Sequence, residues 1–134
     1  MKVANDGALE CIGKDGILFR FEKDNYDRHC AKHLYLYNKS SLSKIESTLV
    51  DPDTITKGPS RDIKKRGKVR KIWDKRTYYK IIGHGRGGMI YVCKVPLFVS
   101  SEKVYIIKTA LLSWTPSIWY VNQNETVEWE RKGH

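Results

Sequence analysis

The sequence predicts an α+β fold in which N-terminal helices pack on an antiparallel β-sheet. The chain has 134 residues, which is the size of one ordinary domain. Its residues are 40% hydrophobic, enough to bury a core without disulfide bonds or a structural metal. Segments with helical periodicity come first, and strand-type segments joined by short turns follow. This order indicates a single domain, residues 1–134, with its helices on one face of the sheet.

A turn, a short strand and a helix are expected first. Gly13–Gly16 has the composition of a tight turn, and the mainly apolar residues 17–21 that follow it predict a strand. Asp24 or Asn25 can cap a helix, because short polar side chains accept hydrogen bonds from the first backbone N–H groups. We expect this helix to run as far as His33.

A second helix is expected over residues 41–49. A serine at position 40 or 41 can cap it. Its apolar residues recur at three- and four-residue spacing, so they share one face. Pro52 lies just beyond the last of them and ends the helix.

Three strands are expected in the second half of the chain, where aromatic and β-branched residues are frequent. They cover residues 72–82, 89–99 and 104–112. The polar, basic stretch 57–71 before them is expected to be a mobile loop. The glycine-rich stretch 83–88 is expected to be a turn, and the tail after Pro116 alternates enough for an edge strand.

The cysteines and the N-terminus favour a reducing, cytoplasmic location. Cys11, Cys30 and Cys93 are far apart and form no CxxC pair, so neither a zinc ribbon nor a thioredoxin-type motif is present. We expect small, buried, reduced thiols. No apolar run approaches the roughly 18–20 residues that cross a bilayer. Residues 1–14 lack the pattern of a signal peptide, and no membrane partner is expected.

The basic residues are concentrated in one part of the chain. The formal net charge is +10, and residues 57–76 contain ten basic residues against two acidic ones. Such a cluster neutralises phosphates, and neighbouring aromatic rings can stack on unpaired bases, which favours single-stranded RNA. A solvated loop beside ordinary strand aromatics is the alternative. The candidate RNA-binding residues are Arg61, Lys64, Lys65, Arg66, Lys68, Arg70, Lys71, Trp73, Tyr78 and Arg86.

Two histidines and a threonine are candidates for chemistry. His29 and His33 are four residues apart and share a helix face, and imidazole suits proton transfer near neutral pH. They can also be half-buried helix residues. No HExxH motif or third ligand accompanies them, so no metal or other cofactor is expected. Thr109 follows the apolar run 104–107; its hydroxyl can bond a phosphate oxygen or belong to an ordinary strand residue. The stretch 83–88 lacks the GKS or GKT ending of a phosphate-binding loop.

The order of these motifs resembles that of a known group of proteins. The helix with two histidines is followed by a second helix and by LVDPDTI at 49–55, then by YYK at 78–80 and VYIIKTA at 104–110. The arrangement resembles the phage-associated branch of the metal-independent ribonuclease superfamily that joins barnase, EndoU, the colicin anticodon nucleases and RelE. The related toxin BrnT shares the theme. The resemblance covers about residues 19–112, within a nuclease-like core of about 17–112.

The resemblance implies a helix pair packed on a curved antiparallel sheet, with RNA on the open face of the sheet. It also implies cleavage by attack of the ribose 2′-hydroxyl on the adjacent phosphate, which leaves a 2′,3′-cyclic phosphate. Position by position, His33 corresponds best to the helix histidine, with His29 second, and Thr109 to a hydroxyl on the terminal strand. Lys80, with Tyr79 beside it, corresponds to the cationic position. The long basic stretch before the first sheet strand departs from the pattern.

The first interpretation is therefore a metal-independent endoribonuclease of the toxin or phage-effector type, acting in the cytoplasm of the producing or the target cell. Its partners would be RNA, such as tRNA or another single-stranded RNA, and a cognate antitoxin or immunity protein. The alternative is a non-catalytic RNA- or DNA-binding module that uses the basic stretch 57–76. A third interpretation is an interaction protein that binds an acidic partner such as an inhibitor. The histidines separate the first two, because a pure binder does not need them.

Overall fold

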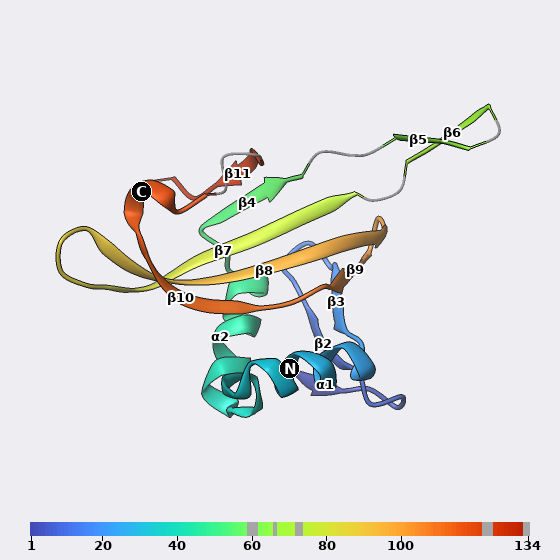
Figure 1. Cartoon of the computed structure of the whole chain (residues 1–134). Helices are drawn as coiled ribbons and strands as arrows, with labels where there is room; N and C mark the ends of the chain where they lie inside the picture. Colours follow the sequence, from blue (N-terminus) through green and yellow to red (C-terminus); the bar gives the residue numbers. More distant parts are fainter. Residues whose placement is uncertain (59–61, 66, 72–73, 122–124, 133–134) are drawn as a thin grey trace.

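Nine strands form one open, mostly antiparallel sheet, and two helices pack against one of its faces (Figure 1). The computed structural model describes the chain apart from residues 59–61, 66, 72–73, 122–124 and 133–134, and for residues 37, 62–65 and 68–71 it describes the backbone alone. The helical elements are α1 (Lys23–Lys32), η1 (Leu34–Tyr37), α2 (Lys39–Val50) and η2 (Ser117–Trp119). The strands are β1 (Lys2–Val3), β2 (Leu9–Ile12), β3 (Leu18–Phe21), β4 (Thr54–Lys57), β5 (Asp62–Lys65), β6 (Lys68–Lys71), β7 (Lys75–His84), β8 (Met89–Ser101), β9 (Val104–Ile107), β10 (Leu111–Pro116) and β11 (Thr126–Glu130). The predicted α+β class is confirmed.

The sheet is mixed because two segments far apart in the chain run in parallel. Its order is β1-β2-β3-β9-β8-β7-β4-β11, and β3 pairs with β9 in parallel, with Leu18 opposite Val104. The other described pairs of this sheet are antiparallel. The edge strand expected in the tail is β11, which pairs with β4.

The expected strand 104–112 is divided in two. β9 and β10 lie end to end along one edge of β8, while β7 occupies the other edge. Between them, residues 108–110 leave the ladder opposite Pro96, which has no N–H group to donate across the sheet. Only the Pro96 carbonyl remains, and it accepts a hydrogen bond of 2.9 Å from the Lys108 N–H. We call residues 108–110 the β9–β10 link.

The core lies between the helices and the sheet. On α2, Ile45 and Leu49 are buried, as the spacing of the apolar residues predicts. They belong to one cluster with Phe19, Tyr78 and Cys93 from the sheet. Because side chains alternate along a strand, Tyr78 faces the helices and its neighbour on β7 faces the outer side. A smaller cluster, built around the buried residues Tyr79, Ile90 and Val92, lies on that outer side.

The helices begin and end a little differently from the expectation. α1 starts at Lys23 without a side-chain cap and ends at Lys32, so His33 lies just beyond it, and its N–H donates to the His29 carbonyl at 2.7 Å. α2 starts at Lys39 because the Asn38 side chain, rather than a serine, accepts a hydrogen bond of 2.8 Å from the Ser40 N–H.

The basic stretch 57–71 is not a plain loop, because β5 and β6 form a two-stranded antiparallel hairpin within it. Gly67 adopts a positive φ of 75° at the turn, a conformation that glycine reaches without strain. Figure 1 shows this hairpin extending away from the nine-stranded sheet. Among the described residues, β5 and β6 pair only with each other. We call residues 62–71 the basic arm.

Candidate functional site

The segment that carries both candidate histidines is fastened to the β9–β10 link. The Asn25 side chain on α1 donates hydrogen bonds to the carbonyls of Ile107 (3.0 Å) and Lys108 (2.9 Å). The Tyr35 hydroxyl on η1 donates to the Ala110 carbonyl at 3.3 Å. These bonds satisfy carbonyl groups at the end of β9 and in the link. They hold the link, with Thr109 at its centre, against the α1–η1 segment.

His29 lies one turn after Asn25 on α1. Its Nδ1 is 2.8 Å from the Asn25 carbonyl oxygen, and its ring meets the Phe21 ring edge-on, with centroids 6.2 Å apart. A carbonyl oxygen can only accept, so Nδ1 carries the proton of this hydrogen bond. In the neutral ring, Nε2 is then the basic nitrogen, which is the form that a proton acceptor requires.

His33 lies at the other end of the same segment, at the C-cap of α1. It is half-buried, and its ring lies against Tyr35 with centroids 5.6 Å apart. Each histidine thus contacts a residue whose side chain binds the β9–β10 link: His29 the backbone carbonyl of Asn25, and His33 the ring of Tyr35. Thr109 is half-buried in the link rather than in a strand.

The structure separates Tyr79 and Lys80 from this group and from each other. Consecutive strand residues face opposite sides of a sheet, so Lys80 lies on the helix side and Tyr79 on the outer side. The Lys80 ammonium donates to the Asp51 carbonyl at 2.7 Å and lies 3.3 Å from the Asp51 carboxylate. Tyr79 is fully buried, and its hydroxyl donates to Glu125 at 2.6 Å.

Glu125 is the centre of a hydrogen-bond cluster that the sequence patterns did not predict. Its carboxylate accepts hydrogen bonds from Thr56 (2.6 Å), Thr77 (3.2 Å) and Tyr79 (2.6 Å). Tyr120 covers the same face, with its ring against Tyr79 and its centroid 5.5 Å away. The part of the outer face over β4 and β7 is therefore covered by the chain itself, whereas the resemblance implied RNA on the open face.

The two aspartates of the DPD motif, residues 51–53, form an ion network at the end of α2. The Asp51 carboxylate pairs with Lys14 at 3.0 Å, with Lys80 and with Arg131. These partners hold the pKa of Asp51 well below its ordinary value, with Arg131 contributing most. Arg131 also pairs with Asp53 at 3.0 Å. The motif thus joins the C-terminal tail to α2 and β7, a structural role.

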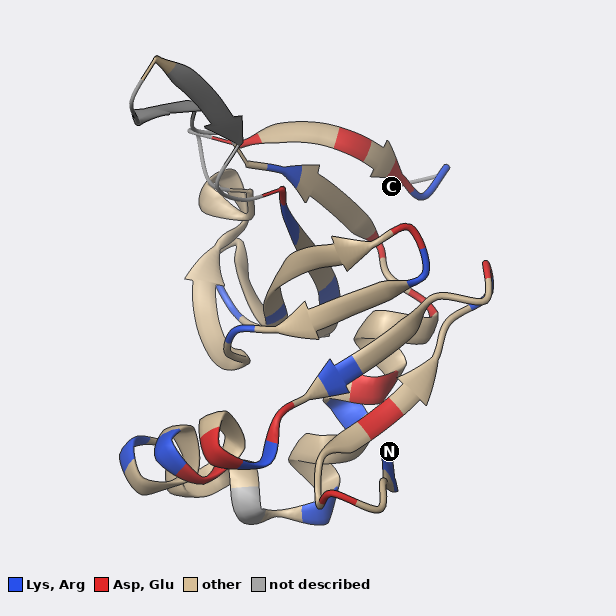
Figure 2. Ribbon diagram, turned by 90° about the vertical axis from the view of Figure 1, so that its right-hand side faces the viewer, with Lys and Arg blue, Asp and Glu red and all other residues tan. Residues whose placement is uncertain are grey.

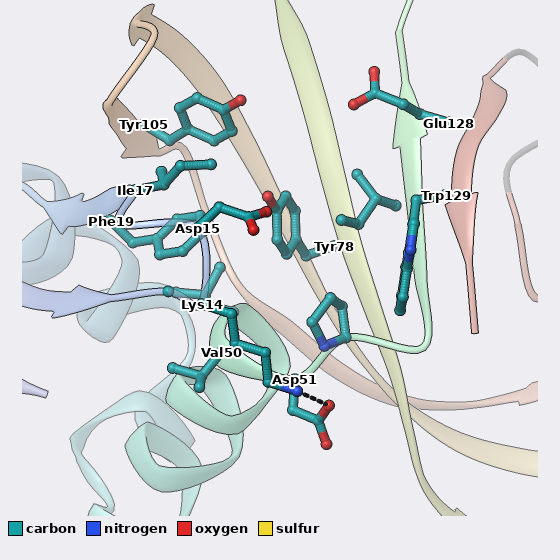
Figure 3. A pocket seen from close by; sticks show the side chains of 14 residues that line it. Lys14, Asp15, Ile17, Phe19, Val50, Asp51, Tyr78, Tyr105, Glu128 and Trp129 are labelled. Atoms are coloured by element: carbon teal, nitrogen blue, oxygen red, sulfur yellow. Dashed lines mark hydrogen bonds and ion pairs between the residues drawn. The ribbon is translucent and has the colours of Figure 1, made fainter. Parts of the chain in front are cut away.

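A cavity of about 450 Å³ opens on the helix side of the sheet (Figure 3). It lies between the β2–β3 turn, the end of α2, and strands β4, β7, β9 and β11. Four aromatic side chains and three carboxylates contribute to its lining. They are Phe19, Tyr78, Tyr105, Trp129, Asp15, Asp51 and Glu128.

The candidate RNA-binding residues fall into four groups. Arg61, Arg66 and Trp73 lie outside the described residues. Tyr78 is buried in the core, with 6% of its surface exposed, and lines the cavity. Arg86 is exposed on the turn between β7 and β8. The remaining members lie on the backbone of the basic arm: Lys64, Lys65, Lys68, Arg70 and Lys71.

The charge is uneven between the basic segment and the rest of the chain. Residues 57–76 hold ten basic and two acidic residues, which is eight of the ten net positive charges of the whole chain. Elsewhere the two signs are interspersed, as Figure 2 shows for α1, where blue and red positions follow one another. The electrostatic attraction for a polyanion is therefore strongest in the segment that contains the basic arm.

The described residues hold neither a metal-binding cluster nor a membrane-spanning helix. No group of three or more histidine, cysteine, aspartate or glutamate side chains is placed to hold a metal ion there. None of the described helices is long and apolar enough to span a bilayer. All three cysteines are buried and free, and burial raises the pKa of Cys11 and Cys93 to about 11.

The chain matches no known family model, no curated protein and no solved structure.

Proposed function

We propose that this chain is a metal-independent endoribonuclease whose reaction takes place where α1 and η1 meet the β9–β10 link. One observation supports the proposal: the Asn25 backbone carbonyl lies against His29 and the Tyr35 ring lies against His33. The side chains of Asn25 and Tyr35 both hydrogen-bond to the link, which carries Thr109. Imidazoles and a hydroxyl are the kinds of group that cleavage by a 2′-hydroxyl needs. The resemblance implies one helix histidine, to which His33 corresponds best and His29 second, and a hydroxyl at Thr109.

The hydrogen bond of His29 assigns its role, and His33 takes the remaining one. His29 accepts the 2′-hydroxyl proton at Nε2, because its Nδ1 is engaged by the Asn25 carbonyl. The 2′-oxygen then attacks phosphorus, and the bond to the 5′-oxygen breaks. His33, in its protonated form, gives a proton to that leaving oxygen, so the products are a 2′,3′-cyclic phosphate and a 5′-hydroxyl. The Thr109 hydroxyl donates to a non-bridging phosphate oxygen.

The basic segment supports the same substrate. RNA must be held near the site through its phosphates, and eight of the ten net charges lie in residues 57–76. A projecting two-stranded ribbon can follow a nucleic-acid backbone without approaching the reacting atoms. The basic arm therefore supplies affinity, and the α1–η1 segment supplies chemistry.

The test compares three histidine variants on a labelled single-stranded RNA. His29→Ala and His33→Ala should each lower the cleavage rate by about 10²–10⁴-fold, the usual contribution of a general acid or base. Loss of the base should remove the acidic limb of the pH–rate profile, and loss of the acid should remove the alkaline limb. His84→Ala is the matched control, because His84 is exposed at the end of β7, away from α1.

Thermal melting and RNA affinity are measured for each variant. Full cleavage by both His29→Ala and His33→Ala, with unchanged melting, would remove the site from the mechanism. A lower melting temperature that accounts for the lost activity would assign the histidines to packing.

The second candidate function is RNA or DNA binding without cleavage. The observation that favours it is the basic arm, which stands apart from the sheet and needs no catalytic residue. Tight, salt-dependent binding to RNA together with no cleavage at any pH would establish this alternative.

A further inference from the structure

We propose that the cavity between the β2–β3 turn and β11 binds an unpaired RNA base, and that the Asp15 carboxylate recognises the N–H edge of that base. The proposal rests on RNA as the substrate and adds the part of the RNA that is recognised.

The walls of the cavity suit a flat aromatic ligand. Figure 3 shows Phe19 and Tyr105 on one side, Trp129 on the other and Tyr78 between them. Phe19 packs edge-on against Tyr78, with centroids 5.2 Å apart, and against Tyr105, with centroids 5.8 Å apart. These contacts fix three of the rings. Trp129 remains 44% exposed and offers a ring on which a base can stack.

The charges around the cavity single out one carboxylate. Glu128 pairs with Arg76 at 2.9 Å, and Asp51 pairs with Lys14. In the described part of the chain, the Asp15 side chain has neither a cation nor a hydrogen-bond donor as partner. Burial raises the pKa of Tyr78 and Tyr105 most, and the Asp15 charge adds a smaller contribution in the same direction.

The backbone of the β2–β3 turn holds Asp15 at the cavity. The Gly13 N–H donates to the Ile17 carbonyl at 2.9 Å, and Gly16 adopts a positive φ of 74°, which closes the turn between them. A side chain at position 13 would place its Cβ 2.7 Å from the Phe19 ring, so this close approach requires glycine. The carboxylate is thus presented by a defined turn.

A base fits these charges better than a cationic side chain does. Lysines stand beside Asp15 at the rim: Lys103 donates to the Asp15 carbonyl at 3.1 Å, and Lys14 has a side chain that is 69% exposed. Because Lys14 is paired with Asp51, Lys103 is the cation that would repel an arginine or lysine of a partner and attract the phosphates attached to a base. A nucleotide can place its neutral ring inside and its phosphate outside.

Among the bases, guanine fits a single carboxylate best. Its N1–H and 2-amino group are adjacent donors, so one carboxylate can accept both hydrogen bonds. The cavity and the proposed reaction site lie at the two ends of β9, because Tyr105 lines the cavity and Thr109 follows the strand. At about 3.3 Å per residue the two positions are roughly 13 Å apart, within reach of one short RNA segment.

The experiment measures binding of nucleoside 5′-monophosphates to the whole chain by calorimetry. We expect GMP to bind more tightly than AMP, CMP and UMP, and about tenfold more tightly than inosine monophosphate, which lacks only the 2-amino group. Asp15→Asn should weaken GMP about tenfold and abolish its advantage over inosine monophosphate. Glu102→Gln is the matched control, because it removes a negative charge from an exposed turn outside the cavity.

Two results would overturn the proposal. One is equal binding of all the nucleotides by wild type and Asp15→Asn. The other is displacement of GMP from the cavity by methylguanidinium at lower concentration than by guanosine, which would make it a pocket for a cationic side chain. Neither result affects the histidine variants, so failure here is distinguishable from failure of the proposed reaction.

Discussion

Replacing Glu125 by alanine should destabilise the fold by about 2–4 kcal/mol. Thr56 and Tyr79 are fully buried, Thr77 is 4% exposed, and all three hydroxyls donate to the Glu125 carboxylate. A buried donor left without its acceptor costs about 1–3 kcal/mol. Two of the bonds are short, at 2.6 Å, and the third is 3.2 Å, so the first two dominate. Water can reach part of the space that the half-buried Glu125 vacates, which keeps the total below the simple sum.

The assay is urea unfolding, in which the midpoint changes while the slope stays constant. Glu125→Gln keeps one acceptor oxygen and should lose only about 1 kcal/mol. Glu102→Ala, on an exposed turn, should stay within about 0.5 kcal/mol of wild type. A double-mutant cycle of Tyr79→Phe with Glu125→Ala should give a coupling of about 1 kcal/mol. Glu125→Ala with the stability of Glu102→Ala would refute the reasoning, because the carboxylate would then not serve these hydroxyls.

Three further outcomes are expected. Asp51→Asn should lose about 1 kcal/mol at pH 7, since its partly exposed ion pairs are each worth a fraction of that. Because the folded pKa of Asp51 is lowered, this contribution is complete above the ordinary aspartate pKa of about 3.9 and is lost progressively as the pH falls from there through the lowered pKa; a difference that persists unchanged at pH 2 would contradict the ion network. Cys11 and Cys93 should resist a thiol reagent at pH 8 until urea unfolds the chain, because burial raises the pKa of each thiol to about 11, and rapid labelling of the native protein would show otherwise. Replacing five basic residues of the arm by alanine should weaken RNA affinity and flatten its dependence on salt; they are Lys64, Lys65, Arg66, Arg70 and Lys71. An unchanged salt slope would make the arm an ordinary solvated surface.

Local patterns were enough to predict the fold class and most elements. The apolar spacing within 41–49 predicted α2, and the β-branched and aromatic runs predicted β7 and β8. The hairpin of the basic arm was missed because its lysines and arginines conceal the alternation of a strand pair. The signal that could have revealed it is Gly67 between two short segments of β-type register.

Long-range pairings were beyond the reach of sequence patterns. The break between β9 and β10 depends on Pro96 in the neighbouring strand, not on residues 104–112 themselves. Tyr79 and Glu125 are 46 positions apart, and Asp51 and Arg131 are 80 apart. Nothing local marks either pair. The alternation rule alone, by contrast, separates Tyr79 from Lys80, and it could have been applied to the sequence.

The two histidines show where sequence and structure complement each other. Their four-residue spacing placed both on one helix face, and the structure ends α1 one residue before His33. What no spacing could supply is the link held by Asn25 and Tyr35, since it joins residues about 80 positions apart. The proposed site depends on that long-range contact.

The most direct test of the central claim is the chemistry of the RNA ends. Purified protein is incubated with 5′-labelled single-stranded RNA in excess EDTA, and the fragments are analysed for a 2′,3′-cyclic phosphate before and after treatment with acid, which opens the ring. The proposed reaction predicts cyclic-phosphate ends in EDTA from wild type and from His84→Ala, and their loss in His29→Ala and His33→Ala. Intact RNA under these conditions, or cleavage that appears only when a divalent metal is added, would contradict it.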